Sequence, residues 1–263
     1  MFSGKYGFFD YKYNIAGYTG QDYGGIAQYL YLCISIVLLI ILLIISRKFS
    51  KEKVLKITKI ISIFLIILYI VKTTWESIYD IKMFGKFNTG LLPFDTCSII
   101  MLAGIISSFS KGKMKKYTDC WIATGAIVGG IANMLFLSAL NYYPFFTFGA
   151  FYSMIWHFFM VYIGLLYIVT NYVPMKYSTI VNGFIFQLII SLLIIPIDFI
   201  FDFDFMLLVN ISSVPFFEGV ASHLTAINLQ FLNPILMLAL YYFSFNLVFL
   251  IPFGIKKILN HRK

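Results

Sequence analysis

The sequence predicts an all-α, polytopic membrane protein with seven transmembrane helices, its N-terminus outside and its C-terminus in the cytoplasm. Three observations lead to this fold class. The chain of 263 residues is 60% hydrophobic and only 12% charged, whereas a soluble domain carries roughly 25% charged residues. Seven apolar runs are long enough to cross a bilayer, which takes about 20 helical residues. Basic residues gather in alternate segments between these runs.

The apolar runs follow one another closely, so that residues 1–263 form a single membrane domain. The first run follows a segment rich in Tyr and Gly, residues 1–25, which lacks the early apolar stretch of a signal peptide and is expected to be extracellular. Residues 201–228 contain too much Phe, Met, Leu and Val for a solvated loop. We expect an outer interfacial or re-entrant segment there, with at least one short helix. The expected transmembrane helices are 26–46, 54–74, 91–109, 118–140, 146–170, 178–200 and 229–253.

The positions of the basic residues predict the orientation. In a seven-helix topology, four segments lie on one side, and they hold 15 of the 20 Lys and Arg residues. The positive-inside rule makes that side cytoplasmic. An even number of helices would put the C-terminal basic cluster on the wrong side. Topology therefore accounts for the net charge of +9, and we expect no nucleic-acid partner. The four segments are 47–59, 111–116, 171–178 and 256–263.

Polar side chains within the predicted spans are the candidate functional residues, because an ionisable group is costly in hydrocarbon. Lys72 and Glu76 are spaced i, i+4 and are expected to pair with each other. The full set contains Lys72, Glu76, Asp95, Cys97, His157 and Asp198, together with the amides Asn133, Asn182, Gln187, Asn233 and Asn246.

Cys97 and His157 form the candidate catalytic pair. Cys97 lies 14 residues before Lys111, and His157 lies 14 residues before Asn171. Both are therefore expected roughly 21 Å above the cytoplasmic boundary, at a rise of 1.5 Å per residue. A thiolate attacks an ester, and a histidine can take the proton and later return it to a leaving group. Pro93 is expected near the start of the third helix, where the helix dipole favours a thiolate.

Each candidate also has a structural interpretation. A buried cysteine is a common small apolar filler, and a histidine can bond a neighbouring helix. Asp95 is expected to cap the third helix or to meet another helix. The three cysteines, Cys33, Cys97 and Cys120, match neither a disulfide framework nor a zinc site. We therefore expect no metal and no cofactor.

Two stretches resemble the YwaF-like family of bacterial integral membrane proteins, over about residues 26–255. They are LLPFDTCSIIMLAG, which contains Cys97, and FYSMIWHFFMVYIGLLYIV, which contains His157. A third stretch, FDFDFMLLVNISSVP, which precedes the last apolar run, resembles the segment that this family has before its last span. The resemblance implies seven helices and kinship with a eukaryotic membrane acyltransferase that acts on ether phospholipids. It also implies that Cys97 is the nucleophile and His157 the base. Bacterial relatives commonly carry a histidine just before this cysteine, whereas this chain has Phe94, Asp95 and Thr96.

Three functions follow as hypotheses. The first is a lipid-modifying enzyme, an acyltransferase or acyl hydrolase, with membrane lipids as partners and Asp95 or Asn133 as supporting polar groups. The second is a small-molecule transporter or substrate-binding membrane subunit, in which the scattered amides would line a solute pocket. The third is a non-catalytic membrane scaffold. The first predicts that Cys97 and His157 face each other beside a lateral opening, and the second predicts a central cavity ringed by amides.

Overall fold

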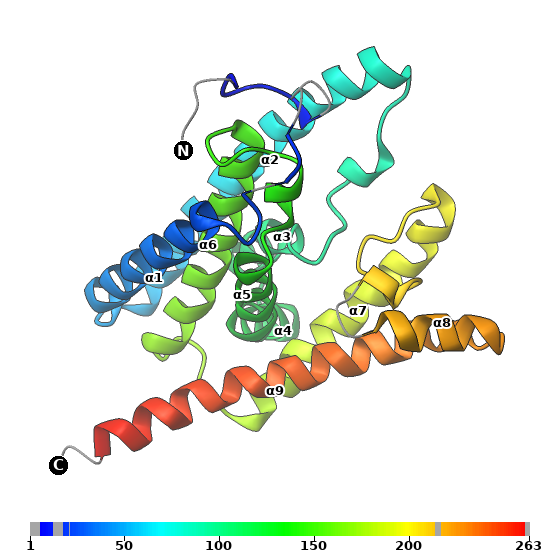
Figure 1. Cartoon of the computed structure of the whole chain (residues 1–263). Coiled ribbons are helices and arrows are strands. Elements are labelled where there is room, and N and C mark those ends of the chain that lie inside the picture. The colour runs from blue at the N-terminus through cyan, green and yellow to red at the C-terminus, as the bar shows by residue number, and fades with distance from the viewer. Residues whose placement is uncertain (1–5, 13–17, 21, 214–216, 261–263) are drawn as a thin grey trace.

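The computed structural model describes residues 6–12, 18–20, 22–213 and 217–260, and its regular elements are helices (Figure 1). The α-helices are α1 (Ile26–Ser46), α2 (Lys51–Phe84), α3 (Ile99–Phe109), α4 (Gly112–Trp121), α5 (Ile127–Leu135), α6 (Phe148–Val169), α7 (Tyr177–Phe201), α8 (Glu218–Ala226) and α9 (Asn233–Asn260). A π-helical turn, η3 (Ile122–Ala126), joins α4 to α5. The short 3₁₀ turns are η2 (Thr89–Leu91), η4 (Ser138–Asn141), η5 (Ile211–Ser213) and η6 (Gln230–Leu232).

Six helical stretches of the described chain are long and apolar enough to cross a membrane. The prediction of an all-α, polytopic membrane protein is thereby confirmed. The third predicted helix is the exception, because α3 has only 11 residues and a length of about 16 Å. The six stretches are Ile26–Ser46, Lys51–Phe84, Gly112–Asn141, Phe148–Val169, Tyr177–Phe201 and Gln230–Val248.

The prediction of a continuous helix over 91–109 was wrong. Pro93 does not begin the helix, because residues 93–98 form turns and a bend before it; the backbone of Leu92 is extended, with ψ 149°, as is usual before a proline. The chain then forms turns, in which the Ser98 N–H donates to the Asp95 carbonyl at 2.8 Å. The helix starts at Ile99, and its N-cap, Ser98, has no side-chain capping bond. One interpretation of Asp95 was that its side chain caps this helix. The structure does not show such a cap on α3.

Other predicted boundaries also shift. The helix expected at 54–74 extends over 34 residues and ends at Gly85, which adopts φ 69°, the left-handed conformation that glycine supplies at helix ends. The helix expected at 118–140 begins at Gly112, because the basic stretch before it is helical although it is not apolar. That span changes to π-helix at Ile122.

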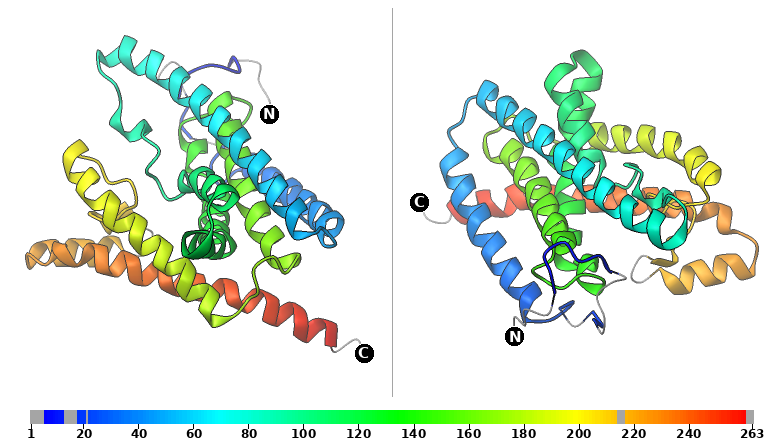
Figure 2. Two further views of the ribbon diagram at one scale, coloured as in Figure 1. Left: turned by 180° about the vertical axis from the view of Figure 1, so that it is seen from behind. Right: turned by 90° about the horizontal axis from the view of Figure 1, so that it is seen from above.

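The π-helical turn η3 lies at the centre of the bundle, where it packs against α3, α6, α7 and α9. Two glycines allow this approach. A Cβ on Gly164 of α6 would lie 2.8 Å from the Ile122 carbonyl oxygen, and one on Gly183 of α7 would lie 2.6 Å from Thr124 Oγ1. Small residues at such crossings let membrane helices pack closely. Figures 1 and 2 show α4 and α5 between α2 and α6 on one side and α7 and α9 on the other.

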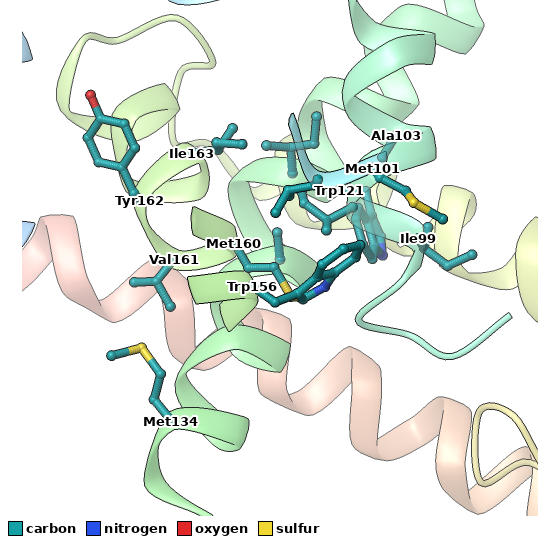
Figure 3. Close-up of a cluster of buried hydrophobic side chains, with 14 of the residues drawn as sticks. Ile99, Met101, Ala103, Trp121, Met134, Trp156, Met160, Val161, Tyr162 and Ile163 are labelled. Carbon is teal, nitrogen blue, oxygen red and sulfur yellow. The ribbon is translucent and has the colours of Figure 1, made fainter. Parts of the chain in front are cut away.

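Two tryptophans fill the centre of the hydrophobic core. Trp121 and Trp156 are both buried and belong to the cluster of core side chains drawn in Figure 3. The Trp121 indole N–H donates to Gln187 Oε1 at 2.8 Å. A buried indole of this kind needs an acceptor, and the bond therefore gives the Gln187 amide a structural role that links α4 to α7.

One end of the bundle is covered by the N-terminal segment and the start of α6. Tyr11 is fully buried, and its hydroxyl donates to Asp80 Oδ1. The Phe148 N–H donates to the Phe8 carbonyl at 2.6 Å, and Asp22 Oδ2 accepts from the Phe145 N–H at 2.9 Å. These bonds hold the described parts of segment 1–25 against the helices. Residues 1–5, 13–17 and 21 of that segment lie outside the described chain.

The long segment 201–228 contains the short helix that the sequence predicts, α8. Phe205 and Met206 are buried, and the Phe205 ring packs edge-on against Phe94 at a centroid distance of 5.3 Å. Asn233 Nδ2 donates to the Val209 carbonyl at 2.8 Å. The segment thus packs over the turns that precede α3.

A polar network fixes the α3–α4 turn near the other end of the bundle. Lys115 Nζ lies 3.1 Å from Asp119 Oδ2, and it donates to the Tyr172 hydroxyl at 2.8 Å. Asp119 Oδ1 also accepts from Ser107 Oγ at 2.5 Å. Burial raises the pKa of the Tyr172 phenol, which therefore remains neutral at physiological pH. The charges of Lys115 and Asp119 are paired with each other, and the network holds α4 to α3 and to Tyr172, which follows α6.

Candidate active site

Cys97 and His157 line the same small cavity, of about 90 Å³. The cavity lies between α2, the turns before α3, and α6. Its volume accommodates a few water molecules or a small polar group. Its lining comprises Tyr69, Lys72, Gly90, Leu91, Leu92, Asp95, Cys97, Ser98, Tyr152, Trp156 and His157.

Cys97 lies in the turn just before α3, one residue ahead of the Ser98 N-cap. Its carbonyl oxygen accepts the Trp156 indole N–H at 3.0 Å, so α6 holds the turn in place beside the residue that precedes His157. The dipole of a helix N-terminus stabilises negative charge. Cys97 therefore lies close to a helix N-terminus, as the sequence predicted, but the N–H groups of Ser98, Ile99 and Ile100 already donate to backbone carbonyl oxygens.

The His157 side chain has one nitrogen bonded and one nitrogen without a partner. Nδ1 lies 2.7 Å from the Ser153 carbonyl oxygen, which can only accept, so Nδ1 carries the proton. Nε2 is then a lone-pair acceptor, and it is buried without a hydrogen-bond partner among the residues that the structure describes. Leaving a buried acceptor unsatisfied costs about 1–3 kcal/mol. The arrangement fixes the tautomer that a general base requires.

A short chain of polar residues positions a cation in the same cavity. Lys72 Nζ lies 2.6 Å from Glu76 Oε2, which confirms the predicted ion pair. The Tyr143 hydroxyl donates to Glu76 Oε1 at 2.9 Å. Lys72 Nζ also lies 5.5 Å from the centroid of the Tyr152 ring. The ammonium group is thus held at the cavity wall, where it can face developing negative charge.

A larger cavity of about 510 Å³ adjoins the other side of Cys97. Asp95 and Cys97 line both cavities. The larger one is mainly apolar, and α5, residues 203–207 and α9 form its walls. Its volume is typical of a cavity for a small organic ligand. Apolar lining residues include Val128, Ala132, Phe136, Phe205, Met237 and Leu240.

The predicted site residues thus divide between the two cavities. Cys97, His157 and Asp95 meet at the small cavity. Asn133 lines the larger cavity, and its Nδ2 donates to the Gly129 carbonyl of its own helix at 3.1 Å. Sequence reasoning did not find Ser153, although its spacing of four residues from His157 is a usable signal. It also missed Tyr69, Tyr152 and Trp156, which no motif distinguishes from core aromatics.

Among the residues that the structure describes, no group of three His, Cys, Asp or Glu side chains could hold a metal ion.

The helices and their apolar lengths define a class of protein, the multi-pass membrane proteins of all-α fold. The chain belongs to the TMEM164 family, whose model matches residues 23–253. That match includes Cys97 and His157 and every candidate span. Comparison with curated proteins and with solved structures gives no match.

Proposed function

We propose that this protein is a membrane acyltransferase or acyl hydrolase in which Cys97 is the nucleophile and His157 the general base. The observation that carries the proposal is the cavity that both residues line, with His157 Nε2 buried and unpartnered. A buried polar atom without a partner calls for an explanation. A thiol proton to accept, and later a leaving group to protonate, supplies one. We expect Cys97 Sγ and His157 Nε2 to lie within about 3–5 Å of each other.

The first half-reaction forms a thioester. His157 Nε2 takes the Cys97 thiol proton, and the thiolate attacks the carbonyl carbon of an acyl ester. The tetrahedral intermediate then collapses, the C–O bond breaks, and the leaving alkoxide takes the proton from His157. Lys72 is placed to face the oxyanion, because its ammonium group lies at the wall of the same cavity.

The second half-reaction releases the acyl group. A hydroxyl of the acceptor lipid, or of water in a hydrolase, gives its proton to His157 Nε2 and attacks the thioester carbonyl. The C–S bond breaks, and the thiolate regains its proton from His157. The apolar cavity beside Cys97 provides a place for the acyl chain, and we expect lipids to reach it from the bilayer.

We also propose the topology that the sequence predicts, with seven crossings and the N-terminus outside. The seventh crossing consists of α3 and the turns before it. Irregular backbone at membrane depth must be covered by protein or line a cavity. Both conditions support the proposal, because Leu91 and Ser98 are buried and most of residues 90–98 line the two cavities. We also propose that the protein is related to the YwaF-like family, whose resemblance implies seven helices.

The hydrogen bonds of the amides favour the enzyme over a solute carrier. Gln187 accepts the Trp121 indole N–H, and Asn233 donates to the Val209 carbonyl. Both side chains are thereby engaged in holding helices together. Asn133 faces the apolar cavity beside Cys97, where it serves the supporting role predicted from the sequence.

Lipid mass spectrometry on cells expressing the wild type and single variants tests the proposal. Wild-type protein should alter the acyl composition of membrane lipids, whereas Cys97→Ala and His157→Ala should abolish the change. Loss of a general base alone lowers rates by about 10²–10⁴. Cys97→Ser should retain little activity, because a serine hydroxyl is far less acidic than a thiol.

Cys33→Ala is the matched control, because Cys33 is exposed on α1 and takes no part in either cavity. It should act like the wild type. If Cys97→Ala changes the lipids as the wild type does, at the same folded amount, the cysteine mechanism is wrong.

A further inference from the structure

A third cavity, separate from the candidate active site, lies between the C-terminal ends of α2 and α7. Its volume is about 460 Å³. Thr89 of η2 lines this cavity, whereas Gly90 and Leu91 line the small cavity that contains Cys97. The turn η2 therefore separates two sites whose chemistry differs.

The charge of this cavity favours a cation. Asp80 and Asp202 line it together with a single base, Lys86. Phe84 is the last residue of α2, and Phe201 is the last residue of α7. A helix C-terminus carries the equivalent of about half a negative charge. Two helix ends and two carboxylates thus act on one space.

Asp80 supplies an acceptor without a partner. Its side chain is buried, with 2% of its surface exposed. Oδ1 accepts the Tyr11 hydroxyl, but Oδ2 is buried and has no hydrogen-bond partner in the described structure. A buried charged oxygen is strongly destabilising unless a donor or a cation satisfies it. Asp80 also lines the neighbouring cavity, from which a ligand can approach its carboxylate.

The aromatic lining distinguishes between kinds of cation. Phe84, Phe87 and Phe201 line the same cavity as the two carboxylates. Aromatic faces combined with negative charge recognise organic ammonium groups through cation–π attraction. A calcium ion instead takes six to eight oxygen ligands at short range. Three phenyl rings supply no such ligands, and the cavity is far larger than a calcium ion needs.

We propose that the cavity between the ends of α2 and α7 binds an alkylammonium group, with Asp80 and Asp202 as counter-ions and the phenylalanines as the aromatic wall. The ammonium group can belong to a lipid headgroup or to a free amine. Lys86 at the rim suits the phosphate that accompanies the amine in a zwitterionic lipid. This proposal does not depend on acyl transfer at Cys97.

Equilibrium binding of radiolabelled choline to the purified full-length protein tests the site. In detergent, the wild type should bind choline saturably. Asp80→Asn should weaken binding by about tenfold or more, since it removes the charge but keeps an acceptor for Tyr11. Asp202→Asn should weaken binding in the same direction and does not disturb the Tyr11 bond. Glu218→Gln is the control, because it removes an exposed acid on α8, outside the cavity, and should leave binding unchanged.

Reconstitution distinguishes the two sources of the amine. Choline should bind in nanodiscs of phosphatidylglycerol. If added phosphatidylcholine displaces it, the headgroup occupies the site, and if it does not, the ligand is a soluble amine. Absence of saturable choline binding by the wild type would overturn the proposal. Equal binding by the wild type and both aspartate variants would also overturn it, as would calcium binding tighter than choline binding.

Discussion

At the scale of single residues, the site depends on which nitrogen of His157 carries the proton. The Ser153 carbonyl oxygen holds the proton on Nδ1, so Nε2 is the basic atom. A histidine whose Nε2 were bonded to the protein would serve as a structural link between helices, which was the competing interpretation. The missing partner at Nε2 favours the chemical role over the structural one.

The pairing of His157 with Cys97 can be tested without knowing the substrate. In a background with Cys33→Ser and Cys120→Ser, iodoacetamide should alkylate Cys97 through its thiolate. Replacing His157→Gln keeps an amide near the position of Nε2 but removes the base. We expect alkylation at neutral pH to slow by about tenfold or more. The measurement is the rate of mass increase of the folded protein in detergent.

Ser153→Ala is the control for this experiment, because the bond to Nδ1 comes from the backbone carbonyl. The carbonyl survives the substitution, so alkylation should remain close to the rate of the background protein. An unchanged rate in His157→Gln would show that the imidazole does not act on the thiol.

At the scale of elements, the sequence predicted the long apolar helices correctly. It did not predict that the first part of the expected helix 91–109 is non-helical. The bounds of α1 agree with the prediction, because an uninterrupted apolar run has only one way to satisfy its backbone in a membrane. The segment around Pro93 is ambiguous, since proline suits both the first turn of a helix and a turn outside it. Phe94 packs against Phe205, which is far away in the sequence. The local sequence pattern could therefore not predict this contact.

The same distinction applies to the candidate site. Cys97 and His157 were predicted from burial cost and estimated depth, and the structure places both at one cavity. The larger cavity beside them could not be predicted, because residues 203–207 and α9 form much of its wall. Those contacts depend on how the long segment folds back over the bundle.

The close packing around η3 gives a prediction about stability. In Gly164→Ala, the new Cβ would lie 2.4 Å from Ile127 Cγ1 and 2.8 Å from the Ile122 carbonyl oxygen. Overpacking of this kind costs about 1–3 kcal/mol, so the midpoint of unfolding in detergent should fall. Gly129→Ala is the matched control on α5, because its nearest neighbour is Met160 Cε at 3.4 Å. Equal midpoints for the two variants would contradict close packing at η3.

At the scale of the whole molecule, six long helices and the short α3 leave the number of crossings to be tested. The helix α2 has 34 residues and a length of about 51 Å, well beyond the roughly 30 Å of the hydrocarbon core. In the proposed topology its C-terminal end extends past the membrane, on the side of the described parts of the N-terminal segment, which bond to Asp80 and Phe148. The next segment must then return through the bilayer if the α3–α4 turn is to lie on the opposite side.

Cysteine labelling from each side of the membrane measures whether it does. Single cysteines are introduced at Lys86→Cys, Lys113→Cys and Lys176→Cys in a variant from which the three native cysteines have been removed. Lys86 follows α2, and Lys113 lies near the start of α4, so the two are separated only by residues 87–112. In the seven-crossing topology an impermeant maleimide added to intact cells should label position 86 but not positions 113 and 176. The latter two should react only after the membrane is opened, in agreement with the positive-inside rule. In the contrary case, positions 86 and 113 are labelled from the same side, which would mean that α3 and its preceding turns form a re-entrant hairpin. The protein would then have six crossings, and the basic C-terminal cluster would lie opposite the basic segment 47–59.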